Sequence, residues 1–307
     1  ISSTMIADTL ALVPYYANAL TWGKGCGSYI AWGVFERAGL YIGDRYLPPG
    51  VLDENLNVAD VAEDKITEYV GHSWYKGEAT YPSATYATEP EFTGYDLSGG
   101  EARDRYSWVK SPAYEGKQME AGSLARLLVA YQRKVPFVVE HVDQLLRAFG
   151  GSGKLAQFQS TLGRTAIRQV ETLYIATLLK EWVEELAEAI LGGDTECFAS
   201  SQATSGSGSG CWEAPRGALY HSVHIEGGLI KGYQIIIPST WNLAPRDEQG
   251  NLGPLEQALI GVPVYDIDKP INALRTVHSF DPCTACAVHI VEPATGKEFR
   301  VVTSPWR

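Results

Sequence analysis

The residues best suited to chemistry lie in the segment HSFDPCTACAVH, residues 278 to 289. Cys283 and Cys286 are three residues apart, Asp281 precedes them, and His289 follows three residues later. Two thiolates at this spacing can bind one soft or borderline metal ion, such as zinc, nickel, copper(I) or the iron of a cluster. The same spacing occurs in disulfides and redox pairs, so the pair alone leaves several kinds of site open.

Each of these kinds of site makes a further demand on the sequence. A structural zinc site needs four ligands, but there is no second CxxC, and His221 and His224 should alternate faces of a strand. A thioredoxin-type pair follows a strand, whereas a helix is expected before Cys283. A disulfide is compatible with the spacing but not required by it. The remaining possibility is a metal cluster whose other ligands lie elsewhere.

The composition narrows the class of protein. The chain has 307 residues, of which 45% are hydrophobic and 20% charged, enough for one large or two ordinary domains with a buried core. A net charge of −11 argues against a nucleic-acid partner. No apolar run reaches the length of a membrane span, and the N-terminus lacks a signal-peptide pattern. Because the first residue is Ile, we expect a piece of a longer chain.

The other three cysteines fit packing or loop positions better than ligand positions. Cys26, Cys197 and Cys211 have no motif spacing, and an odd total of five is not a disulfide framework. The glutamates that follow one another along residues 181–188 fit a solvated helix face better than a metal site.

Hydrophobic periodicity predicts a mostly helical α+β chain without repeats. Two long helical stretches are expected, at 118–149 with a kink or break at Pro136, and at 155–193. Other expected elements are a helical start, a loop-rich stretch at 45–117, a flexible Ser/Gly loop at 200–210, a β-hairpin at 220–225 and 230–237, a short helix at 253–263, and a second at 268–280 with Asp268 as its N-cap.

Several segments, in order along the chain, resemble the large subunit of nickel–iron hydrogenases of the uptake or membrane-bound type. They are HSWY (72–75), YSWVKSPAYEGKQMEAGSLARLLVAY (106–131), TLGRTAIR (161–168), EAPRGALYH (213–221), IIPSTWN (236–242), GPLEQALIG (253–261) and DPCTACAVH (281–289). The resemblance covers essentially the whole chain as the C-terminal half of such a subunit. It implies an α+β, mostly α fold: a long-helix bundle core with a β-hairpin and a loop-rich periphery. Residues 1–289 would form one domain, and 290–307 a cleavable extension.

The resemblance also implies a role for each residue of the motif. Cys283 would be a terminal nickel ligand, and Cys286 would bridge nickel to an iron that carries carbon monoxide and cyanide. Arg216 would lie above the open metal position, and Asp281 would pair with it and orient it. Arg216, Asp281 and Cys286 are thus the expected catalytic residues.

Further expected contacts surround this centre. Pro215, Pro238 and Arg216 would surround the diatomic ligands, and Ser239 would form a hydrogen bond with a cyanide. His289, with the main-chain carbonyl of Ile235, would bind a structural magnesium or iron ion.

The implied reaction is reversible heterolytic cleavage of dihydrogen to protons and electrons. The electrons would pass to a small subunit that carries the iron–sulfur clusters, since this chain has no cysteine set for them. Other implied partners are the missing N-terminal half, a maturation endopeptidase and a membrane cytochrome b. Such subunits are often carried to the periplasm, or the outer face of the membrane, by the small subunit; a cytoplasmic location stays open.

Two departures from the family pattern shape these expectations. The family's N-terminal cysteine pair is absent, and Cys26 in GKGCGSY is not its equivalent, so this chain would supply only half of the nickel ligands. The residues after the expected cleavage point, His289–Ile290, are still present. We hypothesise that the uncut tail keeps the cysteine pair from closing over the metal; full nickel occupancy and hydrogen uptake with the tail attached would contradict this.

Two other classes remain as alternatives. A hydrogen-sensing or non-catalytic relative would keep much of the same sequence, and slow turnover would distinguish a sensor. A zinc-binding structural protein would contain zinc in place of nickel.

Overall fold

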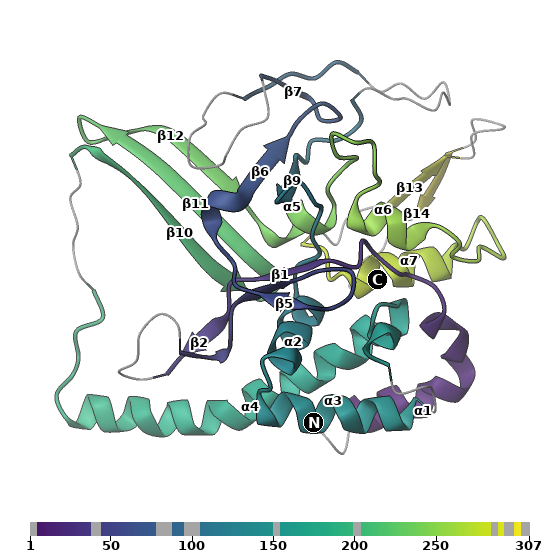
Figure 1. Cartoon of the computed structure of the whole chain (residues 1–307), viewed down its shortest axis with the longest axis horizontal. Helices are drawn as coiled ribbons and strands as arrows, with labels where there is room; N and C mark the ends of the chain where they lie inside the picture. Colours follow the sequence, from purple (N-terminus) through teal and green to yellow (C-terminus); the bar gives the residue numbers. More distant parts are fainter. Residues whose placement is uncertain are drawn as a thin grey trace.

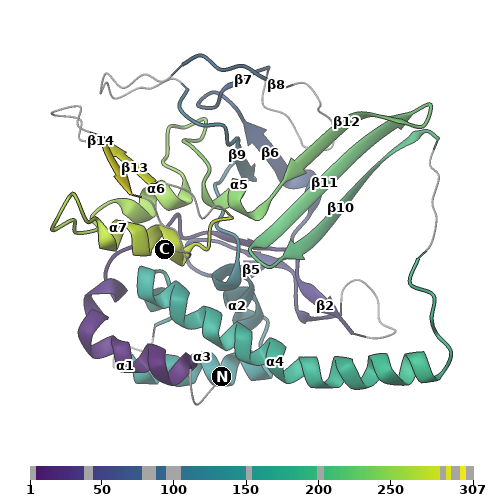
Figure 2. The same cartoon turned by 180° about the vertical axis from the view of Figure 1, so that it is seen from behind.

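The computed structural model describes residues 5–37, 44–77, 88–94, 105–149, 154–198, 204–283, 288–291 and 298–301. The described chain is α+β: α1, α3 and α4 lie along one side, whereas most strands lie on the other side together with the short helices α5 and α6 (Figure 1, and from behind in Figure 2). The helices are α1 Ala7–Tyr16, α2 Ser123–Gln132, α3 Pro136–Ala148, α4 Thr161–Leu191, α5 Pro238–Asn242, α6 Pro254–Leu259 and α7 Ile271–Ser279. None of the helices in this described part is both long and apolar enough to cross a membrane.

The long helical stretch predicted at 118–149 is divided at Pro136, as expected. Helix α2 ends at Gln132, and Pro136 is the first residue of α3, where its missing N–H costs no hydrogen bond. The first five residues of the predicted stretch do not belong to a helix, because α2 begins only at Ser123.

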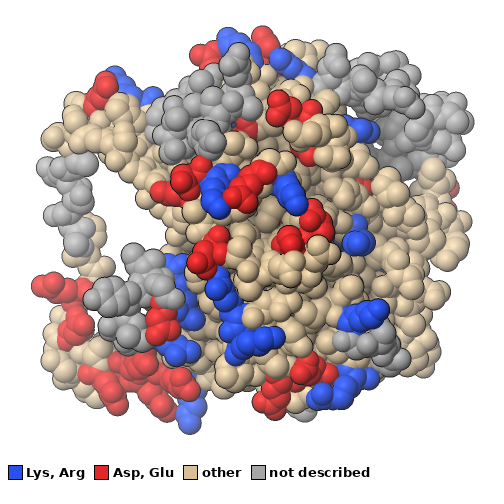
Figure 3. All heavy atoms as spheres, in the orientation of Figure 1, with Lys and Arg blue, Asp and Glu red and all other residues tan. Residues whose placement is uncertain are grey.

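Helix α4 is the longest element, with 31 residues and a length of roughly 46 Å. The Ser160 side chain caps it by accepting a hydrogen bond from the Gly163 N–H. Its first half is largely buried, whereas its second half projects away from the other helices (Figures 1 and 2). Acidic side chains gather on the projecting end (Figure 3), which confirms the predicted solvated face.

The strands are β1 Tyr29–Ala31, β2 Val34–Glu36, β3 Arg45–Leu47, β4 Gly50–Leu52, β5 Val58–Ala59, β6 Ile66–Tyr69, β7 Tyr75–Lys76, β8 Glu89–Pro90, β9 Ser111–Tyr114, β10 Gly206–Ala214, β11 Gly217–Glu226, β12 Leu229–Ile236, β13 Val288–Val291 and β14 Glu298–Val301. Two three-stranded sheets have the orders β1-β4-β5 and β10-β11-β12, and the other strands form antiparallel pairs. The stretch 45–117, predicted to be loop-rich, therefore contains several strands. They have two to four residues each, too few for a period-two pattern to be visible.

The predicted hairpin is confirmed as β11 and β12, joined at Gly227 and Gly228. A third strand, β10, was not predicted, and its first residues, 206–210, belong to the segment expected to be a flexible loop. Glycine and serine have little strand preference of their own, so this strand exists because β11 supplies a complete antiparallel partner. The predicted cap of the last helix is also wrong: α7 begins at Ile271, and its N-cap is Pro270.

Strand β1 lies between two apolar cores. Tyr29 and Ala31 pack into the first core, with side chains of α2, α3, α4, β3 and β4. Ile30 of β1 and Trp32 just after it pack into the second, with β11, β12 and Trp241 of α5. Since successive strand residues face opposite sides, β1 joins the helices to the sheet β10-β11-β12.

A buried carboxyl group on β6 should make the stability of the fold depend on pH. Burial raises the pKa of Glu68 to about 7, although Lys110, 3.7 Å away, opposes the shift; the Gln234 side chain of β12 also donates to it. The folded state then holds a proton that the unfolded chain releases at lower pH, so stability falls as pH rises from about 4.5 to about 7. The full effect is on the order of 3 kcal/mol.

Glu68→Gln removes this titration. We expect the midpoint of thermal unfolding, measured between pH 5 and pH 8, to fall less steeply with pH in Glu68→Gln than in the wild type. Identical slopes would show that Glu68 ionises normally in the folded chain.

Candidate metal centre

Three segments that are distant in sequence converge on one site. They are the two-residue turn Pro215–Arg216 between β10 and β11, the start of α5, and the residues that follow α7. The Nε of Arg216 lies 3.6 Å from Oδ1 of Asp281. The hydroxyl of Ser239 donates to the Cys283 thiol at 3.1 Å, and the Cys283 N–H approaches the same hydroxyl oxygen at 3.4 Å. Four of the site residues predicted from the sequence therefore form two contacting pairs.

The turn that carries Arg216 rests on the start of α2. Gly217, just after the turn, has φ +126°, and a Cβ there would lie 2.4 Å from the Gly122 nitrogen. Gly122 has φ +122°, and its own Cβ would lie 3.2 Å from the Arg216 carbonyl oxygen. Two glycines in conformations that other residues rarely adopt thus allow the two backbones to touch. This contact fixes the position of the turn relative to the start of α2.

Gly217→Ala should displace this turn. The added methyl group meets backbone atoms that cannot rotate away, and the positive φ adds strain of about 1–3 kcal/mol. Gly228→Ala is a matched control at the other end of β11, because Gly228 has φ +75° with nothing within 4 Å of the added Cβ. We expect thermal unfolding to show a clearly larger loss of stability for Gly217→Ala; equal losses would mean that the close approach is unimportant.

Asp281 has a conformation that turns the chain toward Ser239. Its φ is +51°, a left-handed value that aspartate tolerates better than most residues, and its N–H donates to the His278 carbonyl at 3.0 Å. Helix α4 holds the preceding residues: Arg168 donates to the Ser279 carbonyl at 2.7 Å, and the Arg164 guanidinium lies 3.9 Å from the centre of the Phe280 ring.

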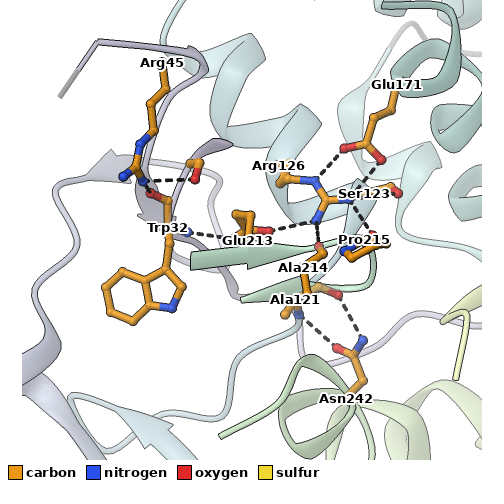
Figure 4. Close-up of polar contacts among 11 residues, drawn as sticks. Trp32, Arg45, Ala121, Ser123, Arg126, Glu171, Glu213, Ala214, Pro215 and Asn242 are labelled. Atoms are coloured by element: carbon orange, nitrogen blue, oxygen red, sulfur yellow. Dashed lines mark hydrogen bonds and ion pairs between the residues drawn. The ribbon is translucent and has the colours of Figure 1, made fainter. Parts of the chain in front are cut away.

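The short helix α5 is fixed, through its last residue, on the same support as the Arg216 turn. The Asn242 side chain accepts from the Ala121 N–H at 2.9 Å and donates to the Ala121 carbonyl at 3.0 Å (Figure 4). Ala121 precedes Gly122, against which the turn packs. Pro238 is the first residue of α5 and is buried, and Ser239 beside it is 8% exposed. Ser239 and Arg216 are thus held by one short segment of backbone.

The cavity at this site carries an excess of positive charge. Arg216, Arg168 and Asp281 line it, together with the mutually paired Arg164 and Glu120. Burial lowers the pKa of Arg168, and the Asp281 carboxylate opposes this shift. The Nε of Arg216 is buried without a hydrogen-bond partner among the described residues. Two guanidinium groups facing one carboxylate suit an anionic ligand, as a thiolate–cyanide metal group would be.

The structure describes the other expected ligands only in part. Ile235 lies in β12 opposite His221, with a side chain that is 42% exposed, and His289 lies in β13, where its backbone pairs with that of Arg300 in β14. Cys286 lies outside the described residues.

The remaining cysteines agree with the packing interpretation. Burial raises the pKa of Cys26 and of Cys211 to about 12 each, which disfavours the thiolate that a metal needs. Cys197 is exposed in the segment after α4, and all four cysteines in the described chain, Cys283 included, are free.

Sequence reasoning missed the buried arginines that support the site. Arg126 and Arg164 are 4% and 2% exposed, and each lies on a helix among other buried residues. An arginine inside an apolar run such as LARLLVAY is itself a signal, because a buried guanidinium must find carboxylate partners elsewhere in the fold.

Comparison with known proteins identifies the family. The model of the nickel-dependent hydrogenase family matches residues 1–289. The Hydrogenase-2 large chain of Escherichia coli K12 is 36% identical over 311 residues, covering 95% of this chain and 53% of that one. The uptake hydrogenase large subunit of Azotobacter chroococcum is also 36% identical, with 94% and 53% covered. A [NiFeSe]-hydrogenase structure from Dm. baculatum aligns with TM-score 0.72 and 30% identity, over 91% of this chain and 55% of that one.

The chain spans about half the length of these relatives. The match of the family model over nearly the whole chain shows that this chain belongs to the nickel-dependent hydrogenase family.

Proposed function

We propose that this chain is the C-terminal part of the catalytic large subunit of an uptake-type nickel–iron hydrogenase, which cleaves dihydrogen reversibly to protons and electrons. The observation that supports this most strongly is that the Arg216–Asp281 pair lines a cavity, while the Ser239–Cys283 pair lies only two residues further along the chain from Asp281. These residues come from three separate segments, so their meeting is a property of the fold.

Cys283 and Cys286 would hold the nickel–iron group with its carbon monoxide and cyanide ligands. The group, when bound, supplies the Lewis-acidic site at which dihydrogen is split. The Ser239 hydroxyl, which already donates to the Cys283 thiol, can donate to an anionic ligand from the same place. Arg216 holds a permanent positive charge at the cavity, and Asp281 limits the directions in which its planar guanidinium can turn.

Other residues would shape the surroundings of this centre. Pro215 and Pro238 are the apolar residues next to Arg216 and Ser239, and they would exclude water from the diatomic ligands. His289 and the carbonyl of Ile235 would bind the structural magnesium or iron ion. Helices α2, α3 and α4 would be the bundle that supports all of these segments.

The subunit would act in a larger assembly. It needs the N-terminal half of the large subunit for the other two nickel ligands, and a small subunit with iron–sulfur clusters to receive the electrons. A maturation endopeptidase acting at His289–Ile290, an electron-accepting membrane cytochrome b, and a periplasmic or outer-face location reached through the small subunit complete the proposal.

Hydrogen uptake by the full-length large subunit with its small subunit tests this function. We expect reduction of an artificial electron acceptor that depends on dihydrogen, together with exchange of deuterium gas with water protons. Exchange with very slow uptake would indicate a sensor, and nickel-loaded protein with neither activity would overturn the proposal.

A further inference from the structure

A buried guanidinium lies directly behind the turn that carries Arg216. Arg126, on α2, donates to the carbonyl oxygens of Pro215 at 2.9 Å and Ala214 at 3.2 Å (Figure 4). These are the two residues immediately before Arg216. Arg126 therefore holds the backbone immediately before the residue that lines the cavity, Arg216.

Two carboxylates hold Arg126 in place. Glu171 of α4 accepts from Nε at 2.5 Å and from Nη2 at 3.0 Å, and Glu213 of β10 accepts from Nη1 at 2.7 Å. All three side chains are at most 7% exposed. The other oxygen of Glu213 accepts from the Trp32 N–H at 2.7 Å. The cluster thus ties α2, α4 and β10 together around one cation with a fixed planar geometry.

The two carboxylates of the cluster keep Arg126 protonated. Burial alone would lower the pKa of Arg126, but Glu171 and Glu213 together raise it, so the guanidinium stays protonated. Burial raises the pKa of Glu213, and Arg126 opposes that shift. Lysine could keep the charge but could not bond both carboxylates and both carbonyls at once.

The Arg216 side chain, in contrast, has few contacts of its own. It is 40% exposed, its partner Asp281 is 44% exposed, and the two are 3.6 Å apart, which makes a weak ion pair. The position of its guanidinium therefore depends mainly on where its own backbone is held.

We propose that Arg126 is a positioning residue for Arg216, which fixes the Pro215–Arg216 turn through its two carbonyl contacts and so sets the place of the Arg216 guanidinium at the metal centre. This role rests on the proposed hydrogenase function. Glu171 and Glu213 serve it by holding Arg126 in one orientation.

Arg126→Lys in the complete large–small subunit complex tests this role. We expect nickel content to stay at the wild-type level, while turnover per nickel falls about tenfold, the loss expected from about one charge-assisted hydrogen bond. We also expect the infrared bands of bound cyanide to shift in position without losing intensity. A purely structural role would lower nickel content and activity together and leave the bands of the remaining centres unmoved.

Arg133→Lys is a control on the same helix. Arg133 is the C-cap residue of α2, pairs with Asp60, and belongs neither to the lining of the described cavity nor to the described contacts of Arg126. We expect its replacement to leave the bands and the turnover per nickel unchanged.

Glu171→Gln covers the case in which Arg126→Lys does not fold. It loosens Arg126 without removing it, and we expect the same direction of band shift with about a threefold loss of turnover per nickel. Wild-type bands and turnover in a folded variant would overturn the positioning role alone. A wild-type complex without nickel or cyanide bands would overturn the hydrogenase function and this role with it.

Discussion

Replacing Cys283 by serine should abolish nickel binding in the assembled subunit. A serine hydroxyl is a hard, protonated donor at neutral pH, whereas nickel in this kind of site is held by soft thiolates. The hydroxyl would still lie close to Ser239, 3.1 Å from the present thiol, so the fold should survive the change. Elemental analysis of the purified complex, with nickel expressed per protein, measures the effect.

Cys197→Ser is the appropriate control. Cys197 is also an exposed, free cysteine, but it lies after α4 and has no second cysteine at motif spacing. We expect full nickel content in that variant. Normal nickel content in Cys283→Ser would refute the assignment of Cys283 as a ligand.

Replacing Arg216 by lysine should leave the metals in place and remove most of the turnover. Both side chains are cations, but the lysine ammonium is a point charge that cannot reproduce the planar guanidinium beside Asp281. We expect turnover to fall about 100-fold or more, as when one preorganised electrostatic group is lost from an active site. Hydrogen uptake normalised to nickel content measures this effect separately from metal loss.

Arg37→Lys is a closely matched control for that variant. Arg37 and Asp44 form a pair at 3.7 Å with side chains that are each 47% exposed, much like the pair of Arg216 and Asp281. They line none of the described cavity. We expect unchanged uptake per nickel in Arg37→Lys. If Arg216→Lys loses nickel as well as turnover, Arg216 supports the metal centre and is not purely catalytic.

The helices were predictable because their signals are local. The helical spacing of apolar residues and the glycines after it predicted α4, and Pro136 predicted the boundary between α2 and α3. Strand β10 escaped prediction, because Gly and Ser carry no strand signal and only the pairing with β11 makes that segment extended. The short strands between residues 45 and 117 escaped for a similar reason.

The site was predictable only in part. The resemblance of short motifs named Arg216, Asp281, Ser239 and Cys283, and the structure places them in two contacting pairs. Their support by Arg126 was not predictable, since Glu171 and Glu213 lie 45 and 87 residues away in sequence and nothing local links them. Such buried networks are set by the assembled fold.

The most direct test of the account is metal analysis combined with infrared spectroscopy on the full-length large subunit, purified with its small subunit after removal of the tail. The account predicts nickel and iron in about equal amounts, with bands of bound carbon monoxide and cyanide. Zinc, or no metal and no such bands, would contradict it, and would mean that this chain keeps the hydrogenase fold without the metal centre.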